Sequence, residues 1–373
     1  MKYNVISADS HVNEPPGTWI DRVPHKFKDV APRVVATPDG GEGWKFPDEA
    51  HIASFGLGSA TLQKGVVRGP EQYIASGLKF EDVAKGSWDP KQHLEDMRTD
   101  GCDASVLYIG VAASVYNIKD RELRLACFQA FNDWLGEFCS YDPARLIGPP
   151  LLPVEEESIQ DAIDELDRNI KRWKVRTAQI PIFPWKRYFD KFYDPLWAGA
   201  EEMGLSLAFH RGLNRPFAFG NSSQGGPFMA NQVMRDFSYC MPFADLIFGG
   251  VFDRFPNLKV VSGEGRTGWL VHFVQRADES IRRHGPWSGI KLNRLPSECV
   301  KQNLYSTFIE DRVGILMREL IGVETQMWSS DYPHSDSTWP NSMKLLDEQF
   351  AGVPAGDRYK MVAGNAIRLY KLN

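Results

Sequence analysis

The chain has 373 residues, enough for one large domain or two ordinary ones, and its 43% apolar and 24% charged residues are typical of a soluble globular protein. Its net charge of −5 argues against a general nucleic-acid binder, because such proteins carry a basic surface. No uncharged apolar run reaches the length of a membrane-spanning helix and no secretory signal is visible, so we expect a cytoplasmic protein with neither nucleic-acid nor membrane partners.

The first predicted strand leads directly into two side chains that could bind a metal. Val5 and Ile6 precede Asp9 and His11, and residues two apart in an extended strand project from the same face. A carboxylate oxygen and an imidazole nitrogen aimed at one point suit Zn²⁺, Mn²⁺ or Fe²⁺. Taken alone, however, the pair is as simply explained by a turn-capping aspartate and a surface histidine. The assignment therefore needs partners from later strands.

Residues 14–87 are rich in glycine, proline and aromatic residues and show little periodicity. The prolines interrupt any long helix or central strand, whereas Trp19, Trp44 and Phe55 make the segment too apolar for a disordered linker. We predict an ordered insertion over the active-site face of a single domain that spans residues 1–373. Insertions of this length often form a lid or a substrate wall.

After Trp88 the pattern changes to short apolar strands that alternate with helices. Including the first one, strands are predicted near residues 5–6, 104–109, 146–152, 178–182, 205–210, 258–262, 303–306 and 326–329. Helices are predicted at 90–99, 121–139, 154–171, 195–203, 231–248, 268–284, 311–321, 342–350 and 360–370. Regular βα alternation predicts a parallel sheet, and eight such units fit a closed (β/α)₈, TIM-like barrel with the insertion after its first strand. The fold class is therefore α/β.

The ends of the later strands carry the missing partners for Asp9 and His11. His210 ends the predicted fifth strand, Glu264 follows the sixth and Asp331 follows the eighth. Singly, His210 could be a hydrogen-bonded core histidine and Asp331 a helix N-cap. In a barrel, however, the carboxyl ends of the strands meet at one face, where the active site lies. Together these side chains supply the nitrogen and oxygen ligands that a metal site requires.

The five cysteines have no spacing typical of a zinc site. They are Cys102, Cys127, Cys139, Cys240 and Cys299. Free thiols in a reducing compartment are the simplest interpretation. Dinucleotide and P-loop motifs are also missing from the sequence, which argues against the common nucleotide-binding folds.

Over nearly its whole length the chain resembles the amidohydrolase-related family, in the branch of the amidohydrolase superfamily that includes aminocarboxymuconate-semialdehyde decarboxylase and γ-resorcylate decarboxylase. The resemblance rests on the order and spacing of these motifs: ADSHVNEP at 8–15, FHRG at 209–212, GGVFDRFP at 249–256, SGEGRTGW at 262–269, SSDYPHSD at 329–336 and GNAIRLY at 364–370. It implies the barrel fold, a small-molecule substrate and a homodimer.

The resemblance also implies one divalent metal ion held by Asp9, His11, His210 and Asp331. Many members have histidine or glutamate at the position of Asp9. A carboxylate there makes the site more anionic and keeps Mn²⁺ as a candidate beside Zn²⁺. Asp331 would also accept a proton from a water molecule that the metal activates.

The sixth strand departs from the pattern of the decarboxylases, which have a catalytic histidine where this chain has Glu264. Glu264 could act as a general base, orient a water molecule or hold Arg266. His334 could be an acid or a substrate hydrogen-bond donor, or an exposed loop histidine. Arg211 and Arg266 could each bind a substrate carboxylate, or form surface salt bridges.

Three functions are compatible with this sequence. The glutamate at position 264 favours a metal-dependent hydrolase that uses a metal-activated water on a small, aromatic or carboxylated substrate. The alternative is a metal-dependent nonoxidative decarboxylase of an aromatic or unsaturated carboxylic acid. A relative that binds a ligand without catalysis is disfavoured by the complete set of metal ligands.

Overall fold

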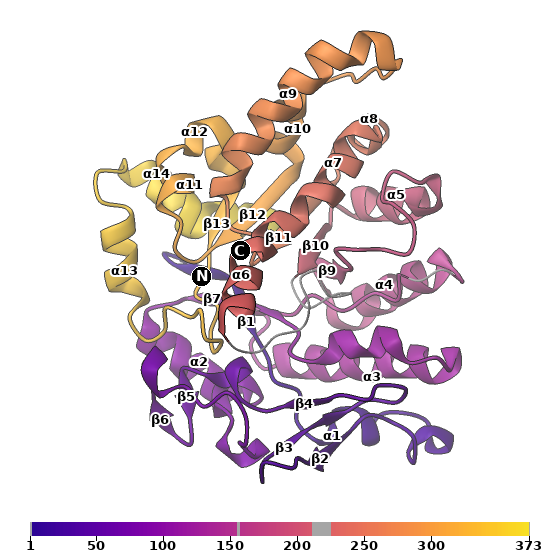
Figure 1. Ribbon diagram of the computed structural model, residues 1–373, viewed down its shortest axis with the longest axis vertical. Coiled ribbons are helices and arrows are strands. Elements are labelled where there is room, and N and C mark those ends of the chain that lie inside the picture. Colours follow the sequence, from indigo (N-terminus) through magenta and orange to yellow (C-terminus); the bar gives the residue numbers. More distant parts are fainter. Residues whose placement is uncertain (1, 155–156, 211–224, 373) are drawn as a thin grey trace.

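The computed structural model describes residues 2–154, 157–210 and 225–372. In these ranges parallel strands alternate with helices, which confirms the α/β class (Figure 1). One parallel sheet has three strands, β1 (Ile6–His11), β7 (Ala104–Tyr108) and β8 (Leu146–Ile147). The other has five strands, β9 (Thr177–Ile180), β10 (Ser206–His210), β11 (Lys259–Gly263), β12 (Leu304–Phe308) and β13 (Gln326–Trp328). Each lies at or next to a predicted strand.

Backbone contacts connect the edges of the two sheets. Leu151, which follows β8, forms a parallel bridge with Gln179 of β9. On the other side, the His11 N–H donates to the Tyr332 carbonyl at 2.8 Å, and the Asp331 N–H donates to the Asp9 carbonyl at 3.0 Å. The carboxyl end of β1 therefore lies against the segment that follows β13, although these two strands are more than 300 residues apart in sequence.

The helices lie around the strands (Figure 1). They are α2 (Pro90–Asp100), α3 (Arg121–Cys139), α4 (Ile159–Trp173), α5 (Asp194–Met203), α6 (Gly225–Met234), α7 (Cys240–Phe248), α8 (Val251–Arg254), α9 (Gly268–Ser288), α10 (Pro296–Asn303), α11 (Arg312–Leu316), α12 (Arg318–Ile321), α13 (Ser342–Gln349), α14 (Ala355–Tyr359) and α15 (Asn365–Leu369). The Asp89 and Asp120 side chains cap α2 and α3 by accepting hydrogen bonds from backbone N–H groups of the first turn. Both helices therefore begin where the sequence predicts.

The segment between β1 and α2 contains ordered elements of its own. They are α1 (Gly17–Ile20), the antiparallel strands β2 (Arg33–Ala36), β3 (Glu42–Lys45) and β4 (Ile52–Ser54), and the pair β5 (Leu62–Gln63) and β6 (Val66–Val67). Trp19 and Trp44 are buried and pack edge to face with ring centroids 4.7 Å apart. The Trp19 indole N–H also donates to the Cys127 carbonyl in α3 at 3.1 Å. Aromatic packing thus ties this segment to α3.

Several predicted helices differ from the observed ones. The predicted helix at 231–248 is divided into α6, a 3₁₀ segment (Arg235–Tyr239) and α7, in which Pro242 occupies the first turn, where its missing N–H costs no hydrogen bond. The helix predicted at 311–321 is divided between α11 and α12 at Met317. The last one consists of a π-helical turn (Lys360–Gly364) followed by α15. Among the described residues, no helix combines the length and apolar character that a membrane span requires.

Candidate metal centre

An irregularity in β1 positions the first two candidate ligands. Ser7 pairs with Ser105 of β7 and Ser10 pairs with Leu107, so Ala8 and Asp9 together lie opposite a single residue. Such a bulge bends the strand locally and changes the direction of a side chain. All six residues of β1 are buried. Asp9 and His11 nevertheless meet, as the sequence predicts, with 3.5 Å between Asp9 Oδ1 and His11 Nε2.

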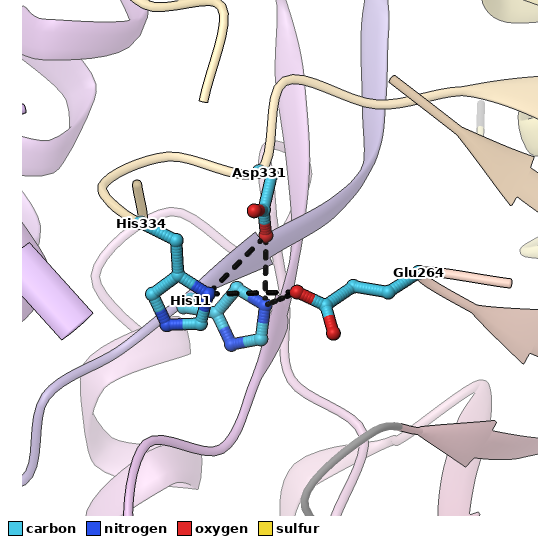
Figure 2. A group of neighbouring side chains, drawn as sticks. All are labelled: His11, Glu264, Asp331 and His334. Carbon is cyan, nitrogen blue, oxygen red and sulfur yellow. Dashed lines mark ion pairs between the residues drawn. The ribbon is translucent and has the colours of Figure 1, made fainter. Parts of the chain in front are cut away.

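The imidazole of His11 lies at the centre of a cluster of carboxylates (Figure 2). Its Nε2 is 3.1 Å from Asp331 Oδ1 and 3.7 Å from Glu264 Oε1. His334 lies beside His11 and faces the same two carboxylates, with its Nδ1 3.4 Å from Asp331 Oδ1 and 3.6 Å from Glu264 Oε1. The two imidazole rings stack with their centroids 3.7 Å apart. The predicted catalytic residues therefore lie together.

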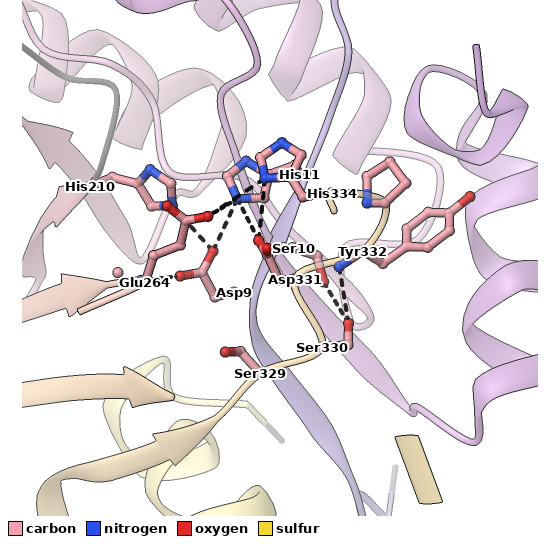
Figure 3. A network of polar contacts seen from close by, with 12 residues as sticks. Asp9, Ser10, His11, His210, Glu264, Ser329, Ser330, Asp331, Tyr332 and His334 are labelled. Atoms are coloured by element: carbon pink, nitrogen blue, oxygen red, sulfur yellow. Dashed lines mark hydrogen bonds and ion pairs between the residues drawn. The ribbon is translucent and has the colours of Figure 1, made fainter. Parts of the chain in front are cut away.

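His210, at the end of β10, joins this cluster through Asp9 (Figure 3). Its Nε2 is 3.3 Å from Asp9 Oδ1. The other oxygen of Asp9, Oδ2, accepts hydrogen bonds from the Thr307 hydroxyl at 3.0 Å and from the Glu264 N–H at 2.5 Å. One carboxylate oxygen is thus fixed by the protein, and the other faces both imidazoles. This arrangement is typical of an oriented metal ligand.

The hydrogen bonds of this cluster show which of its atoms are left to bind a cation. The His11 Nδ1–H donates to the Ile109 carbonyl at 2.9 Å, so Nε2 retains its lone pair. His11 Nε2 and both oxygens of Asp331 are buried and have no hydrogen-bond partner among the described residues. Buried polar atoms without a partner are rare in proteins, and these three are all electron-pair donors. They fit a divalent metal ion.

The electrostatics of the cluster point the same way. Burial lowers the pKa of His11, but the close carboxylates of Asp331 and Glu264 outweigh it, so the pKa is raised well above its usual value. A site that attracts a proton this strongly also attracts a metal cation. When a cation binds, it takes the place of that proton.

The candidate ligand atoms form two groups, which share His11. Within each group, the atoms all lie within 4.8 Å of one another. One contains Asp9, His11 and His210, and the other contains His11, Glu264, Asp331 and His334. The His11 Nε2 has a single lone pair and can bind only one ion. The two groups therefore favour one metal centre.

The backbone at this centre is unusual at the two carboxylates that follow strands. Glu264 has φ of +52° and Asp331 has φ of +56°, the left-handed region that non-glycine residues seldom adopt. Such conformations persist where surrounding contacts hold them, and they are frequent at functional sites. Gly263, directly before Glu264, leaves space for His210, because a Cβ there would lie 2.6 Å from His210 Cδ2.

Of the two arginines predicted to bind a substrate carboxylate, the structure describes Arg266, whose contacts lie outside this cluster. Arg266 donates to the Glu310 carbonyl at 2.7 Å, and its Nε lies 3.3 Å from Asp236 Oδ2. Arg211 lies outside the described residues. Their role in substrate binding stays a prediction.

Sequence reasoning missed several residues that contact the candidate ligands or lie directly beside them. They are the hydroxyl side chains of Ser7, Ser10, Thr307 and Ser330, and the ring of Tyr108, which stacks on His210 with centroids 4.4 Å apart. The available signal was the presence of small hydroxyl residues directly beside each ligand in the motifs at 8–15 and 329–336.

Comparison with known proteins agrees with these motifs. A family model described as amidohydrolase matches residues 9–372. The 2-amino-3-carboxymuconate-6-semialdehyde decarboxylase of Dictyostelium discoideum is 24% identical over 263 residues, which cover 70% of this chain and 71% of that protein. The gamma-resorcylate decarboxylase of a Polaromonas species is 23% identical over 298 residues, which cover 73% and 84%.

Solved structures show the same fold. An amidohydrolase from Mycobacterium avium subsp. paratuberculosis superposes with a TM-score of 0.77 at 20% identity, over 99% of this chain and 100% of that one. A dihydroxybenzoic acid decarboxylase from Polaromonas, solved with bound manganese and the inhibitor 2-nitroresorcinol, superposes with a TM-score of 0.64 at 18% identity, over 100% and 98%.

The preference for hydrolysis, which rested on Glu264, is wrong, because the curated relatives are decarboxylases. The geometry explains why this glutamate was a poor guide. Its Oε1 lies within 3.7 Å of both His11 Nε2 and His334 Nδ1, so an ionisable group able to carry a proton is still present beside the ligands. The match over residues 9–372 establishes that the chain belongs to the amidohydrolase family of enzymes.

Proposed function

We propose that this protein is a metal-dependent, nonoxidative decarboxylase of a small aromatic or unsaturated carboxylic acid. The observation that carries the proposal is the set of buried electron-pair donor atoms on His11 and Asp331 that have no hydrogen-bond partner among the described residues, with Glu264 and His334 beside them. The decarboxylase activity named for the curated relatives supports the same reaction.

Asp9, His11, His210 and Asp331 are the proposed metal ligands. When bound, a divalent ion would supply Lewis-acid stabilisation of the negative charge on the substrate. The donors include the carboxylates of Asp9 and Asp331, with Glu264 nearby, and such an oxygen-rich set makes Mn²⁺ a candidate beside Zn²⁺. Manganese in the Polaromonas decarboxylase structure is consistent with this choice.

In the proposed reaction the bond between the substrate carbon and its carboxylate breaks, carbon dioxide leaves and a proton is added to that carbon. Asp331, Glu264 and His334 are the proposed acid–base groups, since His334 Nδ1 lies within 3.6 Å of both carboxylates. His334 is partly exposed, with 23% of its side chain accessible, so it can exchange protons with solvent. Glu264 takes the role of the family's histidine.

The proposal extends to the architecture around the centre. The parallel bridge between Leu151 and Gln179 and the hydrogen bonds between β1 and the segment after β13 support closure of the two sheets into one (β/α)₈ barrel within a single domain. Residues 14–87 are the proposed substrate wall, which is supported by the hydrogen bond from the Thr61 hydroxyl to the Pro333 carbonyl at 3.1 Å, next to His334. The homodimer stays a prediction.

The test is a reaction screen of dihydroxybenzoates and unsaturated carboxylic acids with the metal-reconstituted enzyme in ¹⁸O-water. We expect carbon dioxide release, loss of exactly one carboxyl group from the substrate and no ¹⁸O in the organic product. The same reaction in ²H₂O should place deuterium on the carbon that lost carbon dioxide. Incorporation of ¹⁸O into the organic product without release of carbon dioxide would contradict decarboxylation, and the His11→Ala variant is the inactive control.

A further inference from the structure

Three buried hydroxyl groups lie directly behind the proposed metal ligands. The Oγ atoms of Ser7, Ser10 and Ser330 form a triangle with sides of 2.9 Å (Ser7 to Ser10), 3.0 Å (Ser7 to Ser330) and 3.2 Å (Ser10 to Ser330). Each of the three residues is at most 3% exposed. Figure 3 shows Ser10 and Ser330 on the side of β1 and the Asp331 segment that faces away from His210 and Glu264. We call these three residues the serine triangle.

The serine triangle connects two segments that are distant in sequence. The Ser7 hydroxyl donates to the Asp9 carbonyl at 2.8 Å and accepts the Ser330 N–H at 2.9 Å. The same Asp9 carbonyl accepts the Asp331 N–H at 3.0 Å. The Asp9 carbonyl oxygen therefore connects the bulge in β1 to the backbone of Asp331. The Ser7 hydroxyl donates to the same oxygen and holds it in place.

Counting protons shows that the triangle acts as a unit. Each hydroxyl has one hydrogen to donate and two lone pairs. Ser7 gives its hydrogen to the Asp9 carbonyl and one lone pair to the Ser330 N–H, so its second lone pair can accept only one hydroxyl hydrogen, from Ser10 or from Ser330. Ser330 also accepts the Tyr332 N–H at 3.4 Å. Removing one hydroxyl therefore changes the hydrogen bonds of the other two.

We propose that the serine triangle is a positioning device that holds the backbones of Asp9 and Asp331 in the geometry required for metal binding. Asp331 needs such support, since its φ of +56° is unfavourable for a non-glycine residue. Groups that orient metal ligands from behind contribute to metal affinity although they never touch the ion. This inference rests on the metal centre proposed above, but not on the reaction.

The neighbouring cavity supplies a matched control. A cavity with space for about one water molecule is lined by all three serines and by Ser105. Ser105 is 1% exposed, pairs with Ser7 in the sheet, and its Oγ has no hydrogen-bond partner among the described residues. A Ser105→Ala change thus removes a buried hydroxyl from the same cavity without removing a bond to either ligand segment.

The test measures metal affinity by competition with a chelating dye, together with the visible spectrum of the Co²⁺-loaded protein, which reports ligand geometry. Ser330→Ala and Ser7→Ala are each expected to weaken binding by about 10 to 100-fold and to change the Co²⁺ spectrum. Ser105→Ala should do neither. The Ser7→Ala, Ser330→Ala double variant should lose less metal affinity than the two single variants would predict if their fold-losses were multiplied. The reason is that the effects of residues in one hydrogen-bond network are not additive. Ser330→Thr retains the hydroxyl and should restore affinity and spectrum.

Unchanged affinity and spectrum in both single alanine variants would overturn the proposal, and so would an equal loss in Ser105→Ala. Additive losses in the double variant would overturn the coupling. If Ser330→Ala fails to fold, Ser7→Ala and Ser330→Thr still decide the outcome. Failure of the metal centre itself is distinguishable, because the parent protein would then bind no stoichiometric Mn²⁺, Zn²⁺ or Co²⁺.

Discussion

Two buried histidines of this protein have the same local hydrogen bonding and opposite electrostatics. His11 and His93 are each 1% exposed, and each Nδ1–H donates to a backbone carbonyl, that of Ile109 at 2.9 Å and that of Gly86 at 2.8 Å. In both rings Nε2 has no hydrogen-bond partner among the described residues. Burial lowers the pKa of His93 to about 4, whereas carboxylates raise the pKa of His11 well above its usual value.

The difference arises from what each Nε2 faces. His11 faces Asp9, Glu264 and Asp331, whereas His93 lines the small cavity beside the serine triangle. A backbone carbonyl selects the tautomer in both cases, but only His11 lies against carboxylates, which makes it the proposed metal ligand. The cavity that His93 lines has space for about one water molecule and none of the centre's carboxylates among its lining residues.

The sharpest test of the difference between His11 and His93 replaces each histidine by alanine. His11→Ala should weaken metal binding by more than about 100-fold, because a ligand is lost and not merely a group that orients one. His93→Ala should retain the metal, since no carboxylate of the centre faces that ring. Metal content after gel filtration measures both. Full occupancy in His11→Ala would refute the ligand assignment.

Glu264→Gln tests the role of one of the carboxylates that His11 faces. The amide keeps the size of the side chain but cannot carry a proton in catalysis. Turnover should fall by about 100-fold or more while metal content is retained, because general acid–base groups contribute factors of this size. Steady-state kinetics combined with elemental analysis separate the two effects. An unchanged turnover number would make Glu264 a structural residue.

His93 should also influence stability in acid. Its pKa of about 4 lies below the ordinary value of 6.5, so between these values the unfolded chain binds a proton that the folded protein does not. The free energy of unfolding therefore falls as the pH decreases, by about 2 kcal/mol from pH 7 to pH 5. His93→Gln should lose this component. Urea unfolding in excess chelator measures it, and an identical pH dependence in parent and variant would count against a neutral His93.

Asp100, in the same cavity, should act in the opposite direction. Burial raises the pKa of this carboxyl to about 6, although hydrogen bonds from Ser342 oppose the shift. The folded protein then binds a proton below pH 6 that the unfolded chain does not, so the free energy of unfolding rises by about 1 kcal/mol from pH 6 to pH 5. Asp100→Asn should remove this gain. In the parent protein the contributions of His93 and Asp100 oppose each other, and only the single variants reveal them.

The smallest expected effect concerns the thiols. Cys102 lines the same cavity as His93, and burial raises the pKa values of Cys127 to about 12 and of Cys240 and Cys299 to about 11. Such thiols are protonated at neutral pH and react slowly. Alkylation of the folded protein should therefore leave its metal content unchanged. A loss of metal upon alkylation would argue against a centre built from nitrogen and oxygen ligands.

The sequence predicted the strands because they depend on local patterns, and it predicted that the candidate ligand side chains would lie close together. Short apolar runs lie in or next to the strands of the two parallel sheets, and α3 begins and ends at the predicted residues, since Asp120 caps its first turn and its apolar spacing is regular. His210 and Asp331 were found because the ends of parallel strands meet at one edge. Pro242 was the neglected signal that divides the helix predicted at 231–248.

Other features depend on contacts between distant segments and could not be predicted. The left-handed conformations of Glu264 and Asp331 have no local sequence signature, because neither residue is a glycine or asparagine. The serine triangle joins residues more than 300 positions apart. The reaction was misjudged because one residue type, glutamate in place of histidine, was given more weight than the overall resemblance to decarboxylases.

The bulge in β1 has a consequence for insertions and deletions. Ala8 and Asp9 lie opposite one residue of β7, so β1 contains one residue more than regular pairing with β7 would need. Deleting Ala8 would retain every ligand and every serine of the triangle, yet Ser7 and Asp9 would become consecutive residues of a continuously paired strand, and the direction of Asp9 relative to Ser7 would change. The site therefore depends on the number of residues between Ile6 and His11 as strictly as on which residues they are. A library that varies loop and strand length should find this short stretch among the least tolerant in the chain.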